Sequence, residues 1–129
     1  MAARFYELHG MRIFECAAEG AQLQKDRDAV ELVGLAWQHR ANFIVIPVER
    51  LSDDFFRPKT RVAGEIIQKF VTYHLRVAIV GDISRHVSES SALRDFVYES
   101  NRGEQVWFVA DLEELEERLR GRLAANERE

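Results

Sequence analysis

Apolar residues along the chain follow two kinds of pattern, short strand-like runs and stripes at helical spacing. Near the N-terminus, Arg4 to Leu8 and Met11 to Cys16 have the pattern of two strands separated by His9-Gly10. A two-residue loop that ends in Gly predicts a tight antiparallel hairpin. Three later runs, rich in β-branched residues, are typical of strands covered on both faces of a parallel sheet: Phe43 to Ile46, Val77 to Val80 and Val106 to Val109.

The stretches between these runs carry apolar residues every three or four positions, which predicts amphipathic helices. Capping residues, Pro and acidic residues mark their starts, and the third helix ends where Asn101 and Gly103 suit a left-handed exit. On the second helix, Glu65 and Lys69 are expected to form an i,i+4 ion pair. The expected starts are Asp28 with Glu31 three residues on, Pro58, one of Ser88, Ser90 and Ser91, and Asp111 with Glu114.

The resulting order of elements is ββαβαβαβα. Strands that alternate with helices need crossover connections, which are right-handed and produce a parallel sheet. The first strand of the hairpin must then run antiparallel at one edge. The sequence therefore predicts an α/β fold: a single domain over residues 1–123 with a mostly parallel five-stranded sheet and an N-terminal hairpin, followed by a frayed tail at residues 124–129.

Composition and charge exclude several classes of function and add little to the prediction of the fold. With 129 residues, 47% hydrophobic and 31% charged, the chain suits one core and does not suit disorder. A net charge of −4 gives no broad attraction to nucleic acid or to an anionic membrane surface. No signal peptide follows Met1 and no apolar run is long enough for a membrane span, so we expect a cytoplasmic protein. The strands and helix stripes use almost all the apolar residues, which predicts that little remains for a binding groove.

Common catalytic and cofactor motifs do not occur in the sequence. It contains no glycine-rich dinucleotide fingerprint, no P-loop and no nucleophile elbow. Cys16 is the only cysteine and is expected to be a small buried hydrophobe, and the four histidines are scattered. We therefore name no catalytic residue, no metal site and no cofactor, and we leave the question of enzyme activity open with the balance against it.

The remaining candidates are polar residues at the carboxyl ends of the parallel strands, the edge where open parallel sheets bind ligands. Asp53 and Asp54 could form an acid/base or metal pair, although adjacent loop carboxylates are more commonly solvated or capping groups. Asp82 could hold a ligand or orient a backbone turn, and the sequence does not choose between these roles. Phe55-Phe56 is expected to plug the core below the loop. The candidate ligand- or partner-binding residues are Asp53, Asp54, Lys59, Thr60, Asp82, Ser84 and Arg85.

Three stretches of the chain together have the character of one protein family. The first combines Asp54-Phe55-Phe56, Lys59-Thr60, Ala63-Gly64-Glu65-Ile66 and Gln68-Lys69-Phe70, the second is LRVAIVGD from Leu75 to Asp82, and the third is LRDFVYESNRG from Leu93 to Gly103. They resemble the bacterial family catalogued as domain of unknown function 4180. The similarity runs over nearly the whole chain and is strongest from about Asp54 to Phe108. It implies no particular activity, substrate or cofactor.

The order of elements is also loosely similar to that of STAS domains of anti-sigma-factor antagonists. In that family a regulated serine lies at the start of the helix after the third strand. Thr60 is the matching hydroxyl by position, with Gly64 near the family's glycine, but the usual Asp-Ser-Ser-Gly sequence is absent. The similarity implies Thr60 as a candidate phospho-acceptor, where a phosphate would add close to two negative charges beside Lys59. The alternative is that the Thr60 hydroxyl closes the first helical turn by hydrogen bonding.

Together these observations favour a non-catalytic regulatory module that docks a protein partner through residues 53–65. The alternative is a small-molecule-binding protein or enzyme that uses Asp54, Lys59, Asp82 and Ser84, which requires a concave pocket at the strand ends. A self-associating structural protein is a third hypothesis. The sequence leaves the oligomeric state open, a homodimer included.

Overall fold

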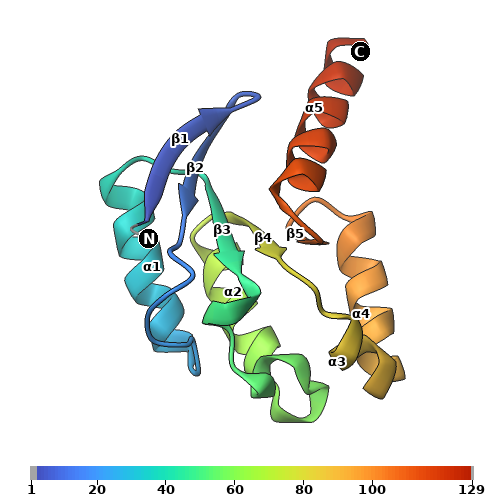
Figure 1. Cartoon of the computed structure of the whole chain (residues 1–129). Helices are drawn as coiled ribbons and strands as arrows, with labels where there is room; N and C mark the ends of the chain where they lie inside the picture. The colour runs from blue at the N-terminus through green and yellow to red at the C-terminus, as the bar shows by residue number, and fades with distance from the viewer. Residues whose placement is uncertain (1–2, 129) are drawn as a thin grey trace.

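The computed structural model describes residues 3–128, with the side chains of residues 3–122. Its sheet has five strands in the order β1-β2-β3-β4-β5 (Figure 1). β1 pairs antiparallel with β2, and the pairs from β2 to β5 are parallel, which confirms the predicted α/β fold and its antiparallel edge strand. The strands are β1 (Arg4–Leu8), β2 (Met11–Glu15), β3 (Phe43–Pro47), β4 (Arg76–Val80) and β5 (Val106–Val109).

The hairpin turn at His9-Gly10 is confirmed in its conformation. The φ angles of His9 and Gly10 are 47° and 84°, and positive φ at both central residues matches the twist of the flanking strands. This turn sets a register in which Phe5 faces Phe14 across the strands, with the two rings stacked at 4.8 Å.

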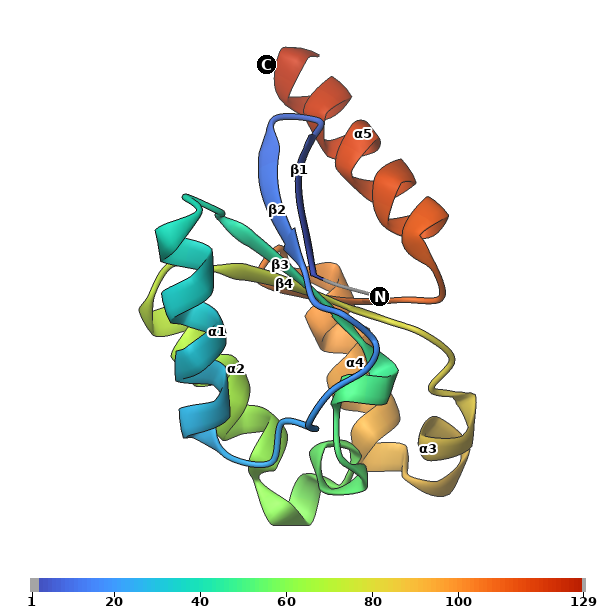
Figure 2. The same cartoon turned by 60° about the vertical axis from the view of Figure 1, so that its left-hand side comes forward.

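The helices cover the two faces of the sheet unequally (Figure 2). Because each crossover moves one strand further in the same direction, right-handed connections place α1, α2 and α4 on the same face. Alternate strand residues such as Ile44 and Ile46 join their core, while Phe43 and Val45 face the side that α5 covers. The long helices are α1 (Asp26–Gln38), α2 (Val62–Thr72), α4 (Ser91–Arg102) and α5 (Leu112–Arg128).

The start of α2 differs from the prediction. The helix expected from Pro58 begins only at Val62, because Arg61 has a left-handed φ of 64°. Such a residue interrupts a right-handed helix, so the turn that starts at Pro58 cannot continue into α2. The connection from β3 to α2 is instead built from three 3₁₀ turns, Val48–Arg50, Asp53–Phe56 and Pro58–Thr60.

A short helix that the sequence pattern did not predict occupies the segment after β4. It is α3 (Ser84–Glu89), and it ends just before Ser90. The Ser90 hydroxyl accepts a hydrogen bond of 3.1 Å from the Leu93 N–H, so Ser90 is the residue that caps α4 among the three candidates.

The end of α4 also corrects an expectation. Gly103 is extended, with φ of −93°, so the helix has no left-handed exit. Asn101 contributes differently from a cap: its amide oxygen accepts from the Phe108 N–H at 2.7 Å and its amide nitrogen donates to the Phe108 carbonyl at 3.2 Å. The Asn101 side chain thus satisfies the N–H and the carbonyl of Phe108, as a neighbouring strand would do at this edge of the sheet.

The starts of α1 and α5 each differ in part from the prediction. α1 begins at Asp26, so Asp28 lies inside its first turn and does not form a capping box with Glu31. The Asp28 carboxylate accepts instead from the N–H groups of residues 24 and 25, at 2.8 and 3.0 Å. Asp111 caps α5 as expected, because its carboxylate accepts from the Glu114 N–H at 2.8 Å. The Glu114 carboxylate lies 3.4 Å from the N–H of residue 110 and not from that of Asp111, so the expected box is not completed.

α5 continues beyond the domain boundary expected at residue 123, since it is helical as far as Arg128. Fraying of residues 124–129 stays a prediction, and Glu129 lies outside the described residues.

Candidate functional site

A polar cleft of about 520 Å³ lies between two segments that follow β3 and β4. Strand order does not reverse at this edge of the sheet, so the cleft is not a topological switch point. It arises because residues 53–60 and 85–90 both extend beyond the strand ends. Four of the seven residues named from the sequence line it, Asp53, Lys59, Thr60 and Arg85, whereas Asp54, Asp82 and Ser84 do not.

An aromatic stack supports the wall of the cleft. Phe55 and Phe56 are each 2% exposed, which confirms the predicted core plug. The His86 ring stacks on Phe56 with the ring centroids 4.3 Å apart and 12° between the planes. Arg85 Nη2 lies 3.3 Å from His86 Nε2 and 3.5 Å from Asp53 Oδ1. Because a guanidinium can only donate, His86 Nε2 is the acceptor in its contact with Arg85.

The three candidate residues outside the cleft make local contacts. Asp54 Oδ1 lies 3.2 Å from Arg57 Nη1 in an exposed pair, so Asp53 and Asp54 have separate ion-pair partners. Asp82 accepts from the backbone N–H of Ser84 at 2.9 Å, and hydrogen bonds from the Ser84 hydroxyl and N–H lower the pKa of Asp82. Asp82 therefore orients the turn that begins α3.

The Thr60 hydroxyl fastens the turn that precedes α2. It lies 2.6 Å from the Asp54 carbonyl and 2.8 Å from the Arg57 carbonyl, within donating distance of both, and it can accept from the Val62 N–H at 3.3 Å. This is the hydrogen-bonding role expected for a residue that closes a helical turn. A phosphate on Thr60 would break these bonds, and modification of this residue stays a prediction.

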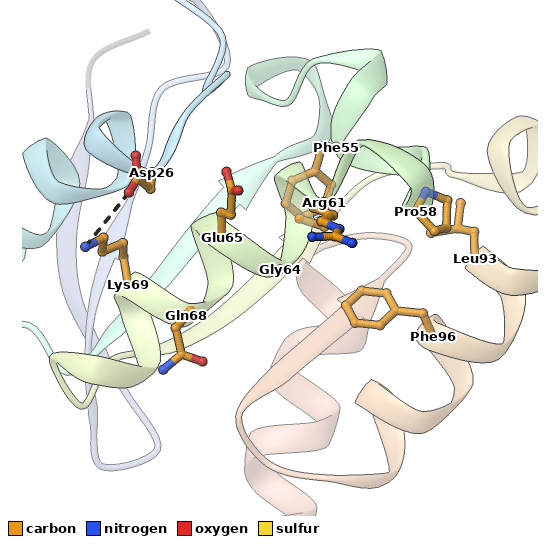
Figure 3. Close-up of a pocket in the computed structure, with 11 residues that line it drawn as sticks. Asp26, Phe55, Pro58, Arg61, Gly64, Glu65, Gln68, Lys69, Leu93 and Phe96 are labelled. Atoms are coloured by element: carbon orange, nitrogen blue, oxygen red, sulfur yellow. Dashed lines mark ion pairs between the residues drawn. The ribbon is translucent and has the colours of Figure 1, made fainter.

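A second concavity, a groove of about 650 Å³, lies between α2 and α4 (Figure 3). The backbone of α2 lies close along that of α1 and approaches the backbone of α4 much less closely. The groove is lined by Asp26, Phe55, Pro58, Arg61, Ala63, Gly64, Glu65, Gln68, Lys69, Leu93 and Phe96. This finding corrects the expectation that the core leaves few apolar residues for a groove, because Phe96 remains 36% exposed.

Charged side chains lie along one side of the groove. Lys69 pairs with Asp26 of α1 at 3.9 Å, not with Glu65 as predicted. Glu65 and Arg61 have no ion-pair partner among the residues that the structure describes. Two features of the sequence could have indicated this site. They are Gly64, a glycine inside helix α2, and Phe96, an aromatic residue of α4 that remains partly exposed.

Other chemistry has less support among the described residues. Among the side chains of residues 3–122, no three His, Cys, Asp or Glu groups are placed to hold a metal ion. Cys16 is buried and burial raises the pKa of its thiol to about 12, so it is a protonated thiol and not an activated nucleophile. In the same part of the chain, none of the helices combines the length and apolar character required to cross a membrane.

The fold and these two concavities define a small α/β protein with candidate binding surfaces on either side of one loop segment. The model of the family described as "Domain of unknown function (DUF4180)" matches residues 8–119, so the chain belongs to this family and the expected resemblance is confirmed. No curated protein and no solved structure matches the chain. The similarity to STAS domains therefore stays a prediction.

Proposed function

We propose that this protein is a non-catalytic regulatory module that binds an amphipathic helix of a protein partner in the groove between α2 and α4. The observation that carries the proposal is the groove itself, a concave surface between two helices with Phe55, Leu93 and Phe96 in its lining. Helix-in-groove binding uses such a surface, with apolar side chains three or four residues apart as anchors.

The dimensions and charges of the groove suit this occupant. Its α2 wall runs from Arg61 to Lys69, which is about 12 Å or two helical turns at 1.5 Å per residue. Gly64 lies midway along the wall, and a Cβ placed there meets no atom within 4 Å. A partner side chain can therefore reach the apolar floor beside Phe96, while Arg61 and Glu65 are available to charged residues of the partner.

Two carboxylates of the small-molecule or enzyme alternative make structural contacts instead. Asp82 accepts a backbone hydrogen bond in the turn before α3, and Asp54 pairs with Arg57 on the surface. Neither lies in the cleft, so the alternative of an enzyme using Asp54, Lys59, Asp82 and Ser84 has only Lys59 in place.

The test is affinity capture with three baits: the wild-type chain, Gly64→Leu and Gly34→Leu. Both glycines are exposed positions inside helices where a Cβ meets nothing within 4 Å. Leu is a better helix former than Gly by up to about 1 kcal/mol, so both variants should fold at least as well as the wild type. Only the Gly64 variant fills the groove.

We expect a partner that binds the wild type and Gly34→Leu but is lost from Gly64→Leu. Equal retention by Gly64→Leu, or equal loss from both variants, would contradict docking in the groove. Sedimentation of the purified wild type adds a check: a dimer that Gly64→Leu converts to a monomer would identify a second copy of this chain as the occupant and overturn the proposal.

A further inference from the structure

Three cationic side chains line the polar cleft at the strand ends. Arg57 and Lys59 come from the segment after β3, and Arg85 comes from the segment after β4. The Lys59 ammonium group has no hydrogen-bond or ion-pair partner among the described residues. The carboxylates that line the same cleft are Asp53 and Glu89, so the cations outnumber them even when His86 is neutral.

The two arginines are held only by exchangeable partners. The Arg85–Asp53 pair spans 3.5 Å with side chains 72% and 62% exposed, and the Arg57–Asp54 pair spans 3.2 Å with side chains 65% and 57% exposed. Exposed pairs of this kind contribute at most about 1 kcal/mol. An incoming anion can therefore take either guanidinium at little cost.

The backbone that carries these cations is well fixed. Arg57 and Lys59 flank Pro58, whose ring restricts φ, and the Thr60 hydroxyl ties the turn to the carbonyls of residues 54 and 57. Below the turn, Phe56 is buried and stacks on His86, the neighbour of Arg85. A site whose backbone is already ordered loses less entropy when a ligand binds.

We infer that this cleft binds the dianionic group of a phosphate monoester, held by Arg57, Lys59 and Arg85. The ligand must displace the carboxylates of Asp54 and Asp53, which contact the two arginines. A ligand carboxylate has the same charge as these groups and would therefore gain nothing by replacing them. A phosphate monoester carries nearly two negative charges at neutral pH and three acceptor oxygens, and guanidinium groups bind phosphate through two parallel hydrogen bonds. The cleft volume of about 520 Å³ also leaves room for the group esterified to the phosphate.

The experiment is a titration of the full chain followed by ¹H–¹⁵N correlation spectra at constant ionic strength. The probes are inorganic phosphate, phenyl phosphate, a peptide with one phosphoserine, its unphosphorylated form, and acetate. Each is added to the wild type, Lys59→Gln, Arg85→Gln and the matched control Arg120→Gln, which removes one exposed positive charge from α5 on the other face of the sheet. The spectra also show directly that each variant is folded.

We expect shifts confined to residues 53–60 and 84–91 with the phosphorylated probes, and binding weakened about tenfold by Lys59→Gln and by Arg85→Gln, as loss of one charge-assisted hydrogen bond predicts. Arg120→Gln should bind like the wild type. Similar affinity for phenyl phosphate and phosphopeptide would indicate a small phosphorylated molecule as the source, and tighter binding of the phosphopeptide would indicate a phosphoprotein.

The inference is overturned if acetate binds as tightly as phenyl phosphate, if Arg120→Gln weakens binding as much as Lys59→Gln, or if no shifts appear at the two segments. Gly64→Leu distinguishes this site from the proposed groove, because filling the groove should leave the phosphate titration unchanged.

Discussion

Gly81, at the end of β4, is the position where the structure makes the sharpest prediction about stability. Its φ is 144°, and a Cβ built on it would lie 2.6 Å from Val48 Cγ2 and 2.9 Å from Val48 Cβ. Its N–H donates to the Val109 carbonyl at 3.0 Å, so the backbone cannot move away without loss of a hydrogen bond to β5. The residue also begins the segment that carries Arg85 to the cleft.

Two costs add in Gly81→Ala. An L residue held in a backbone conformation that favours glycine costs about 1–3 kcal/mol, and insertion of a methyl group into a packed site costs about 1–3 kcal/mol. Allowing for relaxation, we expect the free energy of unfolding to fall by about 2–5 kcal/mol. This is a large share of the 5–15 kcal/mol that is typical of a domain.

The assay is urea unfolding followed by circular dichroism and by tryptophan fluorescence, to which the buried Trp107 and the exposed Trp37 both contribute. The matched control is Gly64→Ala, in a helix and with no atom within 4 Å of the new Cβ, which should raise stability by about 0.5–1 kcal/mol. The double variant Val48→Ala/Gly81→Ala should recover part of the loss, because it removes the closest contact. A Gly81→Ala variant within about 0.5 kcal/mol of the wild type would refute the reasoning.

Three further predictions concern single side chains. Cys16, whose thiol pKa burial raises to about 12, should resist a thiol reagent in the native protein and react on unfolding; fast native labelling would contradict its burial. Asp28→Ala should lower stability by about 1 kcal/mol near neutral pH. Backbone hydrogen bonds lower the pKa of Asp28 in the folded protein. Its contribution to stability is therefore present above the pKa of the unfolded chain, about 3.9, and is lost as pH falls through the folded pKa. The free energies of unfolding of the wild type and Asp28→Ala, measured in urea, should converge in acid. Asn101→Ala should cost about 1–3 kcal/mol and speed hydrogen exchange at the Phe108 amide, whereas unchanged exchange would refute its role beside β5.

Parts of the candidate site were predictable because they depend on where strands end. The carboxyl ends of β3 and β4 are visible in the sequence as the ends of apolar runs, and Asp53, Lys59, Thr60 and Arg85 were correctly placed near one another. The role of each side chain was not predictable, because it depends on distances of a few ångströms. Asp82 lies only three residues from Arg85 in the chain, yet it faces its own turn and not the cleft.

The groove was missed for a different reason. Hydrophobic periodicity shows which face of a helix is apolar, but not how far apart two helices lie on the same sheet. The three 3₁₀ turns and the left-handed Arg61, which set where α2 begins, also lie outside such a pattern.

The sequence by itself determined the five strands, the hairpin turn and the stripes of the long helices, because each depends on sterics and apolar spacing within a few neighbouring residues. The tertiary structure decided which polar side chains share a cleft, that Asn101 completes the edge of β5, and that a groove separates α2 from α4. Those outcomes depend on contacts between segments far apart in the chain, and such contacts are fixed only when the whole sheet and its helices pack together.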